Sequence, residues 1–510
     1  MPPKPKYPDY SYRPDALRTV PPTTSLFTEN PKVDNVPSRF RGIAVRGTQL
    51  AVWDGNQIPG SRYAHYSDIV NNHFQGIARL RNARFMAISG GEPGTNVGPA
   101  RIAACSHLFI AQLPNRSMTA PWMTNLDQDV PFQDDALVKT VALDNDLWHA
   151  GGLSCLGDIL AVPTEKLKGQ TSRIRFLHMK DPMNPGLIGD GLFRPDGKCG
   201  AVALARLSDG TFLCGAWSDS DTTWTDDPAK ARRLDLYQSV SPDFHQGFNL
   251  NPVATIYDGD VQPAPGAGGT FNNYQGIAFI SPQEAGKQDH LYLIGMANRS
   301  KLAPTVQGED RADLFELDLR LLGRPGAKPS IQKLGSREFI CTEWGSNFNA
   351  AVGLHVLESA GELVIYSAYH WRVHGPQSKV PNLIHFAEFR QCDSIGDVRK
   401  AWIELYEHQD FNGRQYVCYG KTGARIPDYG QLIVNGAQFD GVVSSIRYQA
   451  PMGYRYRLYK DKEFANTTSA DYRDLLGDGA VREIRDLNQP PWNFGDQTTS
   501  SQCLSDAEVA

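Results

Sequence analysis

Two histidines stand at equivalent places in neighbouring repeats of this sequence. His73 and His149 each come three residues before a glycine, Gly76 and Gly152, that opens an apolar run. Neutral imidazole is a common ligand of transition metals, so two such side chains near one axis would share a metal ion. The same groups would otherwise hydrogen-bond a polar ligand or simply fill the interior. Two histidines do not complete a metal site, and the sequence leaves these roles open.

Other polar residues fall in matching places of the repeat. Asn273 holds the histidine position in a later repeat, and Arg39 holds it in an earlier one. Arg41, Gln75 and Gln275 stand just before their glycines. Binding sites for small molecules need a few convergent donors and acceptors. We therefore expect these residues, together with the two histidines, to contact a ligand.

Carboxylates also fall in or near the ends of predicted strands. They are Asp158, Glu165, Asp219 and Glu343. Paired carboxylates can hydrolyse glycosides, whereas isolated acids in turns are usually solvated. The chain has nine tryptophans, which would either stack on sugar rings or pack between strands.

An apolar strand opened by glycine returns along most of the chain. The glycines, or the places equivalent to them, fall at positions 42, 76, 152, 203, 276 and 353. Further short apolar runs follow each one, separated by Gly, Asp, Asn and Pro. Helical periodicity is almost absent over this stretch. Four antiparallel strands repeated six times predict an all-β fold, a six-bladed β-propeller over residues 24–390.

The last repeat shows only three strands, at residues 353–357, 362–369 and 382–389. A ring whose last blade lacks a strand would expose an open edge. We expect residues 24–28 to supply the missing outer strand. Residues 1–23 are predicted to be a proline-rich arm and residues 391–401 a polar linker. By analogy with other propellers, a ligand is expected at the mouth of the central channel, where the inner strands begin.

A different pattern begins at residue 402. Tyr406 to Gly413 reads Y-x(4)-F-x-G, and Tyr459 to Asn466 reads Y-x(4)-F-x-N. Through these motifs residues 402–488 resemble a βγ-crystallin domain with two Greek keys. The resemblance implies a folded hairpin whose glycine takes a positive φ, a conformation that Asn also tolerates. Residues 489–510 are expected to form a flexible tail.

The same resemblance implies calcium clamps of the form D/N-D/N-x-x-S/T-S. The first begins at Asp440, has Gly441 in place of the second acid and continues to Ser444. Asp440 and Ser444 are therefore predicted calcium ligands. In the second clamp, which begins at Asp478, Arg482 replaces the hydroxyl residue, and its charge opposes calcium. The alternative is a domain that keeps the fold and has lost most of its metal binding.

Charge and composition limit the classes of molecule that this protein is expected to bind. The formal net charge of −5 at pH 7 creates no field that would attract nucleic acid or an anionic membrane. No apolar run approaches the ~18 residues of a membrane span, and the first residues lack the apolar core of a secretory signal. We expect a soluble protein, either cytoplasmic or a processed secreted form. The eight cysteines are scattered, without a CxxC pair, and are predicted to be buried thiols.

Two functions fit these observations. The first is a protein that binds a glycan or a small polar molecule at the propeller mouth, through an unrepeated set of polar residues. The alternative is an enzyme with its active site in the propeller channel, metal-dependent through His73 and His149 or hydrolytic through strand-end carboxylates. The irregularity of the repeats favours the enzyme, since a multivalent lectin would repeat its site more faithfully.

Overall fold

The computed structural model divides the chain into two compact units; among the described residues, the first contains those up to Phe389 and the second those from Arg390 onward. The residues that it describes are 15–43, 48–55, 73–81, 84–92, 95–97, 100–102, 104–113, 135–166, 171–219, 232–264, 269–284, 286–298, 310–324, 328–339, 346–349, 351–357, 361–369, 383–390, 401–411, 414–419, 425–434, 437–465, 468–478 and 482–509.

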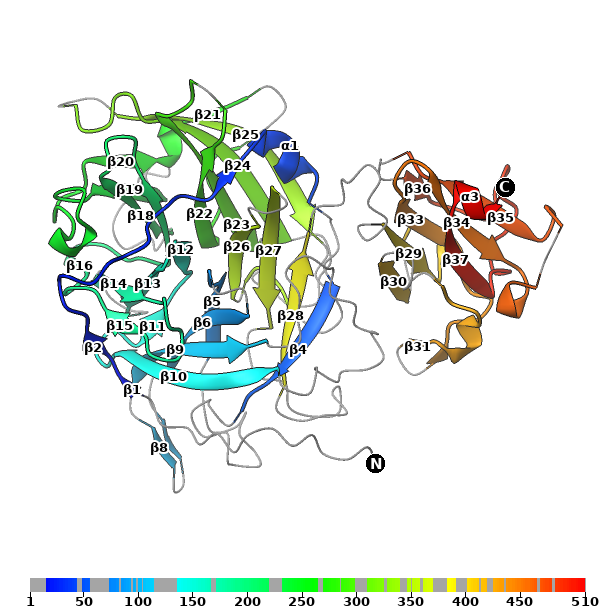
Figure 1. Ribbon diagram of the computed structural model, residues 1–510, viewed down its shortest axis with the longest axis horizontal. Helices are drawn as coiled ribbons and strands as arrows, with labels where there is room; N and C mark the ends of the chain where they lie inside the picture. Colours follow the sequence, from blue (N-terminus) through cyan, green and yellow to red (C-terminus); the bar gives the residue numbers. More distant parts are fainter. Residues whose placement is uncertain are drawn as a thin grey trace. The chain divides into compact units, whose positions relative to one another are not determined.

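Among these residues, the first unit forms five four-stranded antiparallel sheets around one axis, as in a β-propeller (Figure 1). Blade 1 contains β5 (His73–Arg79), β6 (Phe85–Glu92), β9 (Cys105–Gln112) and β10 (Ala136–Asp144). In blade 2 the inner position is shared by β11 (His149–Ala150) and β12 (Ser154–Leu156), which both pair with β13 (Ile159–Glu165). The next strand is β14 (Ser172–His178), and the outer position is shared by β15 (Gly186–Leu187) and β16 (Leu192–Arg194). Blade 3 contains β17 (Ala201–Arg206), β18 (Phe212–Ser218), β19 (Arg233–Gln238) and β20 (Ala254–Tyr257).

The remaining two blades complete the ring. Blade 4 contains β22 (Tyr274–Pro282), β23 (His290–Asn298), β24 (Asp310–Asp318) and β25 (Ser330–Phe339), with β21 (Val261–Pro263) added in parallel to β25. Blade 5 contains β26 (Val352–Leu357), β27 (Glu362–Ala368), β28 (Leu383–Phe389) and β4 (Thr48–Trp53). A separate hairpin joins β7 (Thr95–Val97) and β8 (Ala100–Ile102). Figure 1 shows β5, β22 and β26 near the axis and β10, β25 and β4 toward the rim.

Glycines let the inner strands touch at the axis. A Cβ on Gly76 would lie 2.7 Å from the carbonyl oxygen of Gly151, and one on Gly276 would lie 2.8 Å from that of Val352. Contacts this short leave no room for a side chain. The repeated glycine of the sequence is therefore a packing requirement. Blade 3 has no glycine at the predicted position 203. It meets blade 2 at Gly200, whose carbonyl accepts from the Gly152 amide, and the tight contact there requires glycine on the side of blade 2, since a Cβ on Gly151 would overlap the Gly200 carbonyl oxygen.

Two predictions about the ring need correction. The unit expected at position 42 is not a blade, because residues Val36–Arg41 form the helix α1 and Gly42 is its C-cap. Pro37 stands in the first turn and the Asn35 side chain accepts from the Ser38 amide, so the local sequence favours a helix start. The predicted count of six blades is thereby reduced to the five sheets that the described residues form.

The strand that closes the ring also differs from the prediction. Residues 24–28 form no strand, and β4 is hydrogen-bonded to β28, with Leu50 opposite Phe386. The outer position of blade 5 is thus filled from the N-terminal part of the chain, which removes an exposed edge. The prediction that an N-terminal strand completes the last blade is confirmed, but the strand is β4 and not residues 24–28.

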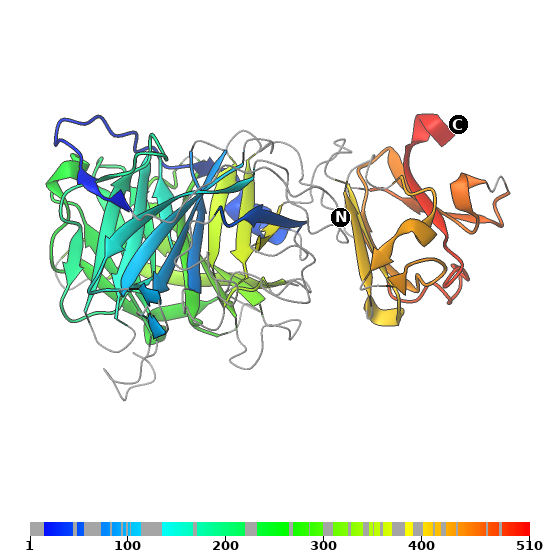
Figure 2. The same ribbon diagram turned by 90° about the horizontal axis from the view of Figure 1, so that it is seen from below.

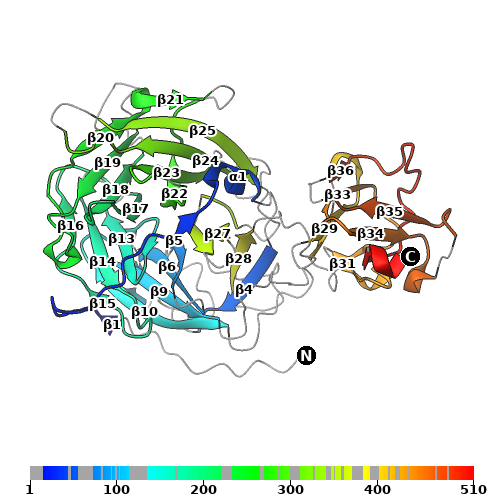
Figure 3. The ribbon, with the colours of Figure 1, turned by 45° about the horizontal axis from the view of Figure 1, so that its top comes forward.

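Residues 15–43 form a strap over one face of the ring. Figures 2 and 3 show this segment, in dark blue, along that face from β1 to α1. Its strands β1 (Asp15–Ala16), β2 (Arg18–Thr19) and β3 (Lys32–Val33) add in parallel to β10, β15 and β22. Asn30 is hydrogen-bonded to the backbone of Arg206 at the end of β17. Since β22 and β17 are reached at their C-terminal ends, the strap covers the face where inner strands end.

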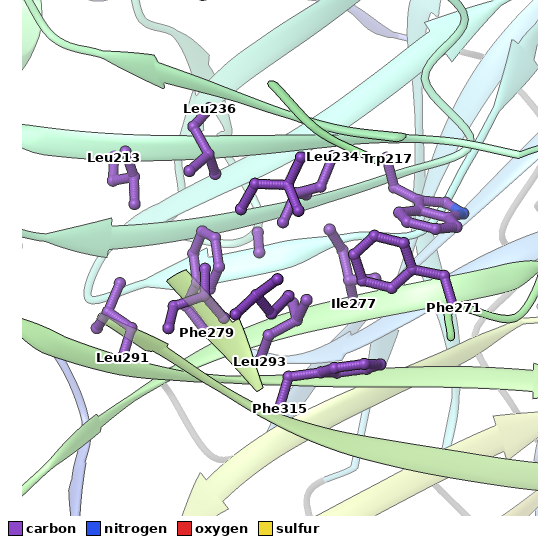
Figure 4. Close-up of a cluster of buried hydrophobic side chains, with 14 of the residues drawn as sticks. Leu213, Trp217, Leu234, Leu236, Phe271, Ile277, Phe279, Leu291, Leu293 and Phe315 are labelled. Atoms are coloured by element: carbon purple, nitrogen blue, oxygen red, sulfur yellow. The ribbon is translucent and has the colours of Figure 1, made fainter. Parts of the chain in front are cut away.

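Apolar side chains fill the space between neighbouring blades. Figure 4 shows the cluster between blades 3 and 4, where Phe279 and Leu293 of blade 4 face Leu213 and Leu234 of blade 3. A Cβ on Gly215 would lie 2.8 Å from the Phe279 ring, so the glycine makes room for that ring. Interiors of this kind are packed as densely as organic crystals and hold the blades rigidly.

The second unit contains two small antiparallel sheets. One contains β30 (Gln415–Tyr419), β29 (Trp402–Tyr406), β33 (Ser445–Gln449) and β36 (Arg482–Ile484), in that order. The other contains β35 (Tyr472–Leu476), β34 (Tyr454–Tyr459) and β37 (Ser500–Ser505), and a short hairpin joins β31 (Ile433–Val434) to β32 (Ala437–Gln438). Strand β36 follows the second motif but joins the sheet of the first, so the second half contributes a strand to the sheet of the first half.

The C-terminal residues belong to this unit, which corrects the predicted flexible tail. Strand β37 pairs along its whole length with β34, from Tyr454 opposite Ser505 to Tyr459 opposite Ser500. The short helix α3 (Asp506–Val509) follows it. The two hairpin positions predicted to have a positive φ, Gly413 and Asn466, lie outside the described residues. No helix in the described part of the chain is long and apolar enough to cross a membrane.

Candidate functional site

The structure brings His73 and His149 together at the end of the axis opposite the strap. Their ring centroids are 5.0 Å apart. His73 opens β5 opposite Gly91, and a Cβ on Gly91 would lie 2.6 Å from the Trp148 carbonyl oxygen and 3.1 Å from the His149 Cα. Glycine at position 91 therefore allows residues 148 and 149 of blade 2 to lie against blade 1.

Glu165 joins the two histidines from the neighbouring strand. It is the last residue of β13 and lies opposite His149 in the ladder. Its Oε1 atom is 3.5 Å from the His149 Nδ1 atom, an ion-pair distance without hydrogen-bond geometry, since Nδ1 makes no hydrogen bond. Its Oε2 atom accepts a 2.8 Å hydrogen bond from the Cys199 amide. The carboxylate is thus anchored to the start of blade 3 and faces the imidazole of blade 2.

Trp148 completes this group of side chains, which we name the axial cluster: His73, Trp148, His149 and Glu165. The indole stands edge-on to both imidazoles, with centroids 6.3 Å from His73 and 5.7 Å from His149. His73 and His149 are each 8% exposed and Glu165 is 6% exposed, whereas Trp148 is half-buried. The cluster therefore combines desolvated polar groups with an accessible aromatic surface, as ligand sites do.

Asn273 is held at the start of the inner strand of blade 4. Its neighbours Asn272 and Tyr274 both donate to the Asp313 Oδ2 atom, at 2.5 and 2.8 Å. Burial opposes the ionisation of Asp313, but Lys333 and the hydrogen bonds from Ser336 and Tyr274 hold its pKa below the usual value. This buried anion anchors the side chains on either side of Asn273, whose own side chain is half-buried.

The two glutamines occupy equivalent irregularities in their blades. The pairing of β5 with β6 shifts between Phe74 and Gly76, and that of β22 with β23 shifts between Tyr274 and Gly276. Gln75 and Gln275 are therefore the extra residues of two β-bulges, which are common next to active sites. Gln75 is 7% exposed and Gln275 is half-buried.

Arg41 does not join this group, which corrects its predicted place. It is an exposed residue in the last turn of α1, at the end of the strap. Asp158 lies at the turn between β12 and β13 and forms a 3.2 Å ion pair with Arg81; its amide donates to Phe27 of the strap. Asp219 follows β18 and is half-buried. Glu343 lies outside the described residues.

Some site residues carried a weak signal in the sequence or none. Trp148 adjoins a predicted site histidine, but sequence alone could not separate it from tryptophans that pack between blades. Glu165 was one of several strand-end acids, and only the cross-strand pairing singles it out. Asp313 gave no signal, because it is one of several acidic residues along β24 and nothing in the sequence separates it from the others.

No group of three or more His, Cys, Asp or Glu side chains is placed to hold a metal ion within the part of the chain that the structure describes. A transition metal shared by His73 and His149 would need ligands beyond this set. That role for the two histidines stays a prediction.

The predicted calcium ligands of the second unit have partners within the protein. The Ser444 hydroxyl donates a 2.6 Å hydrogen bond to the Asp496 Oδ1 atom. The Asp440 Oδ2 atom is 3.2 Å from the Lys462 ammonium. In the second clamp both Nε and a terminal nitrogen of Arg482 bind the Asp478 carboxylate. Calcium binding by Asp440 and Ser444 therefore stays a prediction.

Comparison with known proteins gives fold-level similarity alone. No protein-family model and no curated protein matches the chain. Solved structures similar to the chain include a thermostable family-43 glycoside hydrolase (10% identity, 62% of this chain and 89% of that chain, TM-score 0.34). A family 117 glycoside hydrolase from the marine bacterium Zobellia galactanivorans shows 9% identity over 68% of this chain and 91% of that chain, with a TM-score of 0.32.

A third similar structure concerns the second unit. It is a βγ-crystallin domain from Flavobacterium johnsoniae, with 21% identity over 20% of this chain and 94% of that chain and a TM-score of 0.12. The class of fold follows from the sheet topology of the two units. The chain combines a β-propeller with a βγ-crystallin-like Greek-key domain.

Proposed function

We propose that the propeller binds a glycan or another small polar molecule at the axial cluster. The observation that carries this proposal is the convergence of two imidazoles, one carboxylate and a half-buried indole at the end of the axis that the strap leaves open. Imidazole and carboxylate groups can hydrogen-bond hydroxyls, and an indole presents an apolar face to a sugar ring.

The position of the cluster supports a ligand at the end of the axis. The inner strands touch through Gly76, Gly152 and Gly276, so a ligand would lie over these glycines and not between the strands. The His149 Nδ1 atom is buried without a hydrogen bond, which costs free energy and calls for an explanation that a bound ligand would give. A donor or acceptor on the ligand, or a small shift toward Glu165, would satisfy it.

Glycan-array screening followed by calorimetric titration tests this proposal. We expect Trp148→Ala and His149→Ala to weaken binding of an array hit at least tenfold, about 1.4 kcal/mol. The matched control is His245→Ala, because the His245 Nε2 atom lies 2.9 Å from the Thr24 carbonyl oxygen on the strap side. The control should bind as the wild type does. Equal affinities for all four proteins would refute the axial cluster as the site.

A second function, hydrolysis, is favoured by the pairing of His149 with Glu165. A histidine held beside a carboxylate can transfer a proton in general acid–base catalysis. Release of reducing sugar from the same glycans tests this function. We expect Glu165→Gln to lower kcat by 10²-fold or more while binding remains. If the wild type turns over none of the glycans that it binds, hydrolysis is rejected and binding remains as the proposed function.

A further inference from the structure

A lysine lies between two aspartates in the second unit. The Lys462 Nζ atom is 2.9 Å from the Asp428 Oδ1 atom and 3.2 Å from the Asp440 Oδ2 atom. Lys462 opens the short 3-10 helix Lys462–Phe464 of the second Greek-key motif, whereas both aspartates precede β33 of the first. One ammonium group therefore links the two halves of the domain.

The contacts around this ammonium are arranged for a cation. The Gly430 amide donates to Asp428 Oδ1 at 2.7 Å, so the backbone fixes that carboxylate. A Cβ on Gly430 would lie 2.9 Å from the Lys462 Nζ atom, and the glycine thus makes room for it. The Asp440 Oδ1 atom is buried without a hydrogen bond. Asp440 consequently depends on Lys462 for compensation of its charge.

The charges are stable at neutral pH. Hydrogen bonds to Asp428 and Asp440 raise the pKa of Lys462, and the hydrogen bond from Lys462 lowers the pKa of Asp428. The lysine stays protonated and Asp428 stays ionised. An ammonium ion at about 3 Å from both carboxylates then supplies the positive charge that a metal ion would otherwise supply.

The second clamp repeats the arrangement. Arg482 donates from Nε and from a terminal nitrogen to one carboxylate oxygen of Asp478, the first residue of that clamp. The hydrogen bonds that Arg482 donates to Asp478 raise the pKa of Arg482, so its guanidinium keeps its charge. Each clamp acid, Asp440 and Asp478, is therefore paired with a positively charged side chain. Calcium needs several free oxygen ligands, and these pairs do not fit it.

We propose that Lys462 is a tethered cation that takes the place of calcium between Asp428 and Asp440. The domain is then stable without calcium, and the lysine is what excludes the ion from the first clamp. A cation attached to the chain needs no ion in solution, so the stability of the domain does not follow the calcium concentration. Removal of the lysine leaves the carboxylates of Asp428 and Asp440 without the positive charge that lies between them.

Calcium titration of the full chain by calorimetry tests the proposal, with Lys462→Met as the variant. We expect no saturable binding by the wild type and one site in Lys462→Met, with an affinity at least tenfold above any residual binding of the wild type. Calcium should also raise the unfolding midpoint of this variant and leave that of the wild type unchanged. Adding Asp428→Asn to Lys462→Met should abolish the new site.

The matched control is Lys460→Met, which removes a nearby charge whose ammonium lies 5.5 Å from the Phe494 ring centroid. This control keeps both aspartates paired with Lys462 and should gain no calcium. Binding by the wild type that Ser444→Ala abolishes would overturn the proposal. So would a folded Lys462→Met protein, verified by its circular dichroism, that gains no calcium.

Discussion

Gly353 of blade 5 is in contact with Ile77 of blade 1, so closely that a methyl group on Gly353 would overlap the Ile77 carbonyl oxygen. The inner strands of the last and first blades are joined here, with Val352 opposite Gly76. The contact is between backbones, which cannot move aside as a flexible side chain can.

Gly353→Ala should therefore destabilise the propeller by roughly 3 kcal/mol, the upper end for overpacking. Urea unfolding measures this loss. Gly200→Ala is the matched control, because no atom lies within 4 Å of a Cβ at that position. If both variants unfold at the same urea concentration as the wild type, the inner strands are not packed as described.

Deletion of residues 490–510 should abolish the cooperative unfolding of the second unit. Strand β37 is the partner of β34, and the buried Cys503 lies in its apolar core. Deletion of residues 507–510 alone keeps β37 and Asp506 and should be tolerated. Differential scanning calorimetry distinguishes the two truncations, and an unchanged transition in the longer deletion would show that β37 adds nothing.

The stability of the propeller should decrease as the pH falls below about 6.5. Burial lowers the pKa of His107 to about 4. Between pH 6.5 and pH 4 this histidine is therefore protonated in the unfolded chain but neutral in the folded protein. The contribution of neutral His107 to the free energy of unfolding is thus complete above pH 6.5, and it is lost as the pH falls through 4.

From pH 7.5 to 5.0 the expected loss at His107 alone is about 2 kcal/mol. His107→Gln has no such titration, so its urea-unfolding free energy should fall less than that of the wild type by this amount. Parallel pH dependence in the two proteins would contradict a neutral, buried His107.

Cys199 should resist alkylation while the protein is folded. Burial raises the pKa of its thiol to about 12, and the side chain has no exposed surface. The thiolate, not the thiol, is the nucleophile, so iodoacetamide at pH 8 should modify Cys199 only after urea is added. Peptide mass spectrometry reads the site directly, and rapid labelling without urea would disprove this burial.

Local patterns predicted the strands well and their partners poorly. The four strands predicted from the repeat at Gly276, at residues 276–280, 291–296, 312–319 and 331–340, match β22 to β25 closely, because apolar content and turn residues act over short distances. The stretch around Gly42 shares the pattern Phe-x-Gly-Ile-Ala with an inner strand, yet Asn35 and Pro37 start a helix there. Which segment closes the ring depends on contacts between residues far apart, which the pattern does not contain.

The candidate site shows the same division. The equivalent positions of His73 and His149 in the repeat were visible in the sequence, and the structure places their rings side by side. The pairing of Glu165 with His149 depends on a strand register, and the position of Lys462 depends on how two motifs dock. Neither the register nor the docking has a sequence signature of its own.

The strand that completes blade 5 has a consequence for biosynthesis. Strand β4 leaves the ribosome early, and its partner β28 follows about 330 residues later, roughly 15 to 65 seconds at ordinary rates of translation. Throughout that time β4 lacks its antiparallel partner, and its one other pairing among the described strands is that of Trp53 with Ala136 of β10. The propeller therefore closes only when its last strand emerges, and chaperones that shield unpaired strands have their longest opportunity to act on this segment.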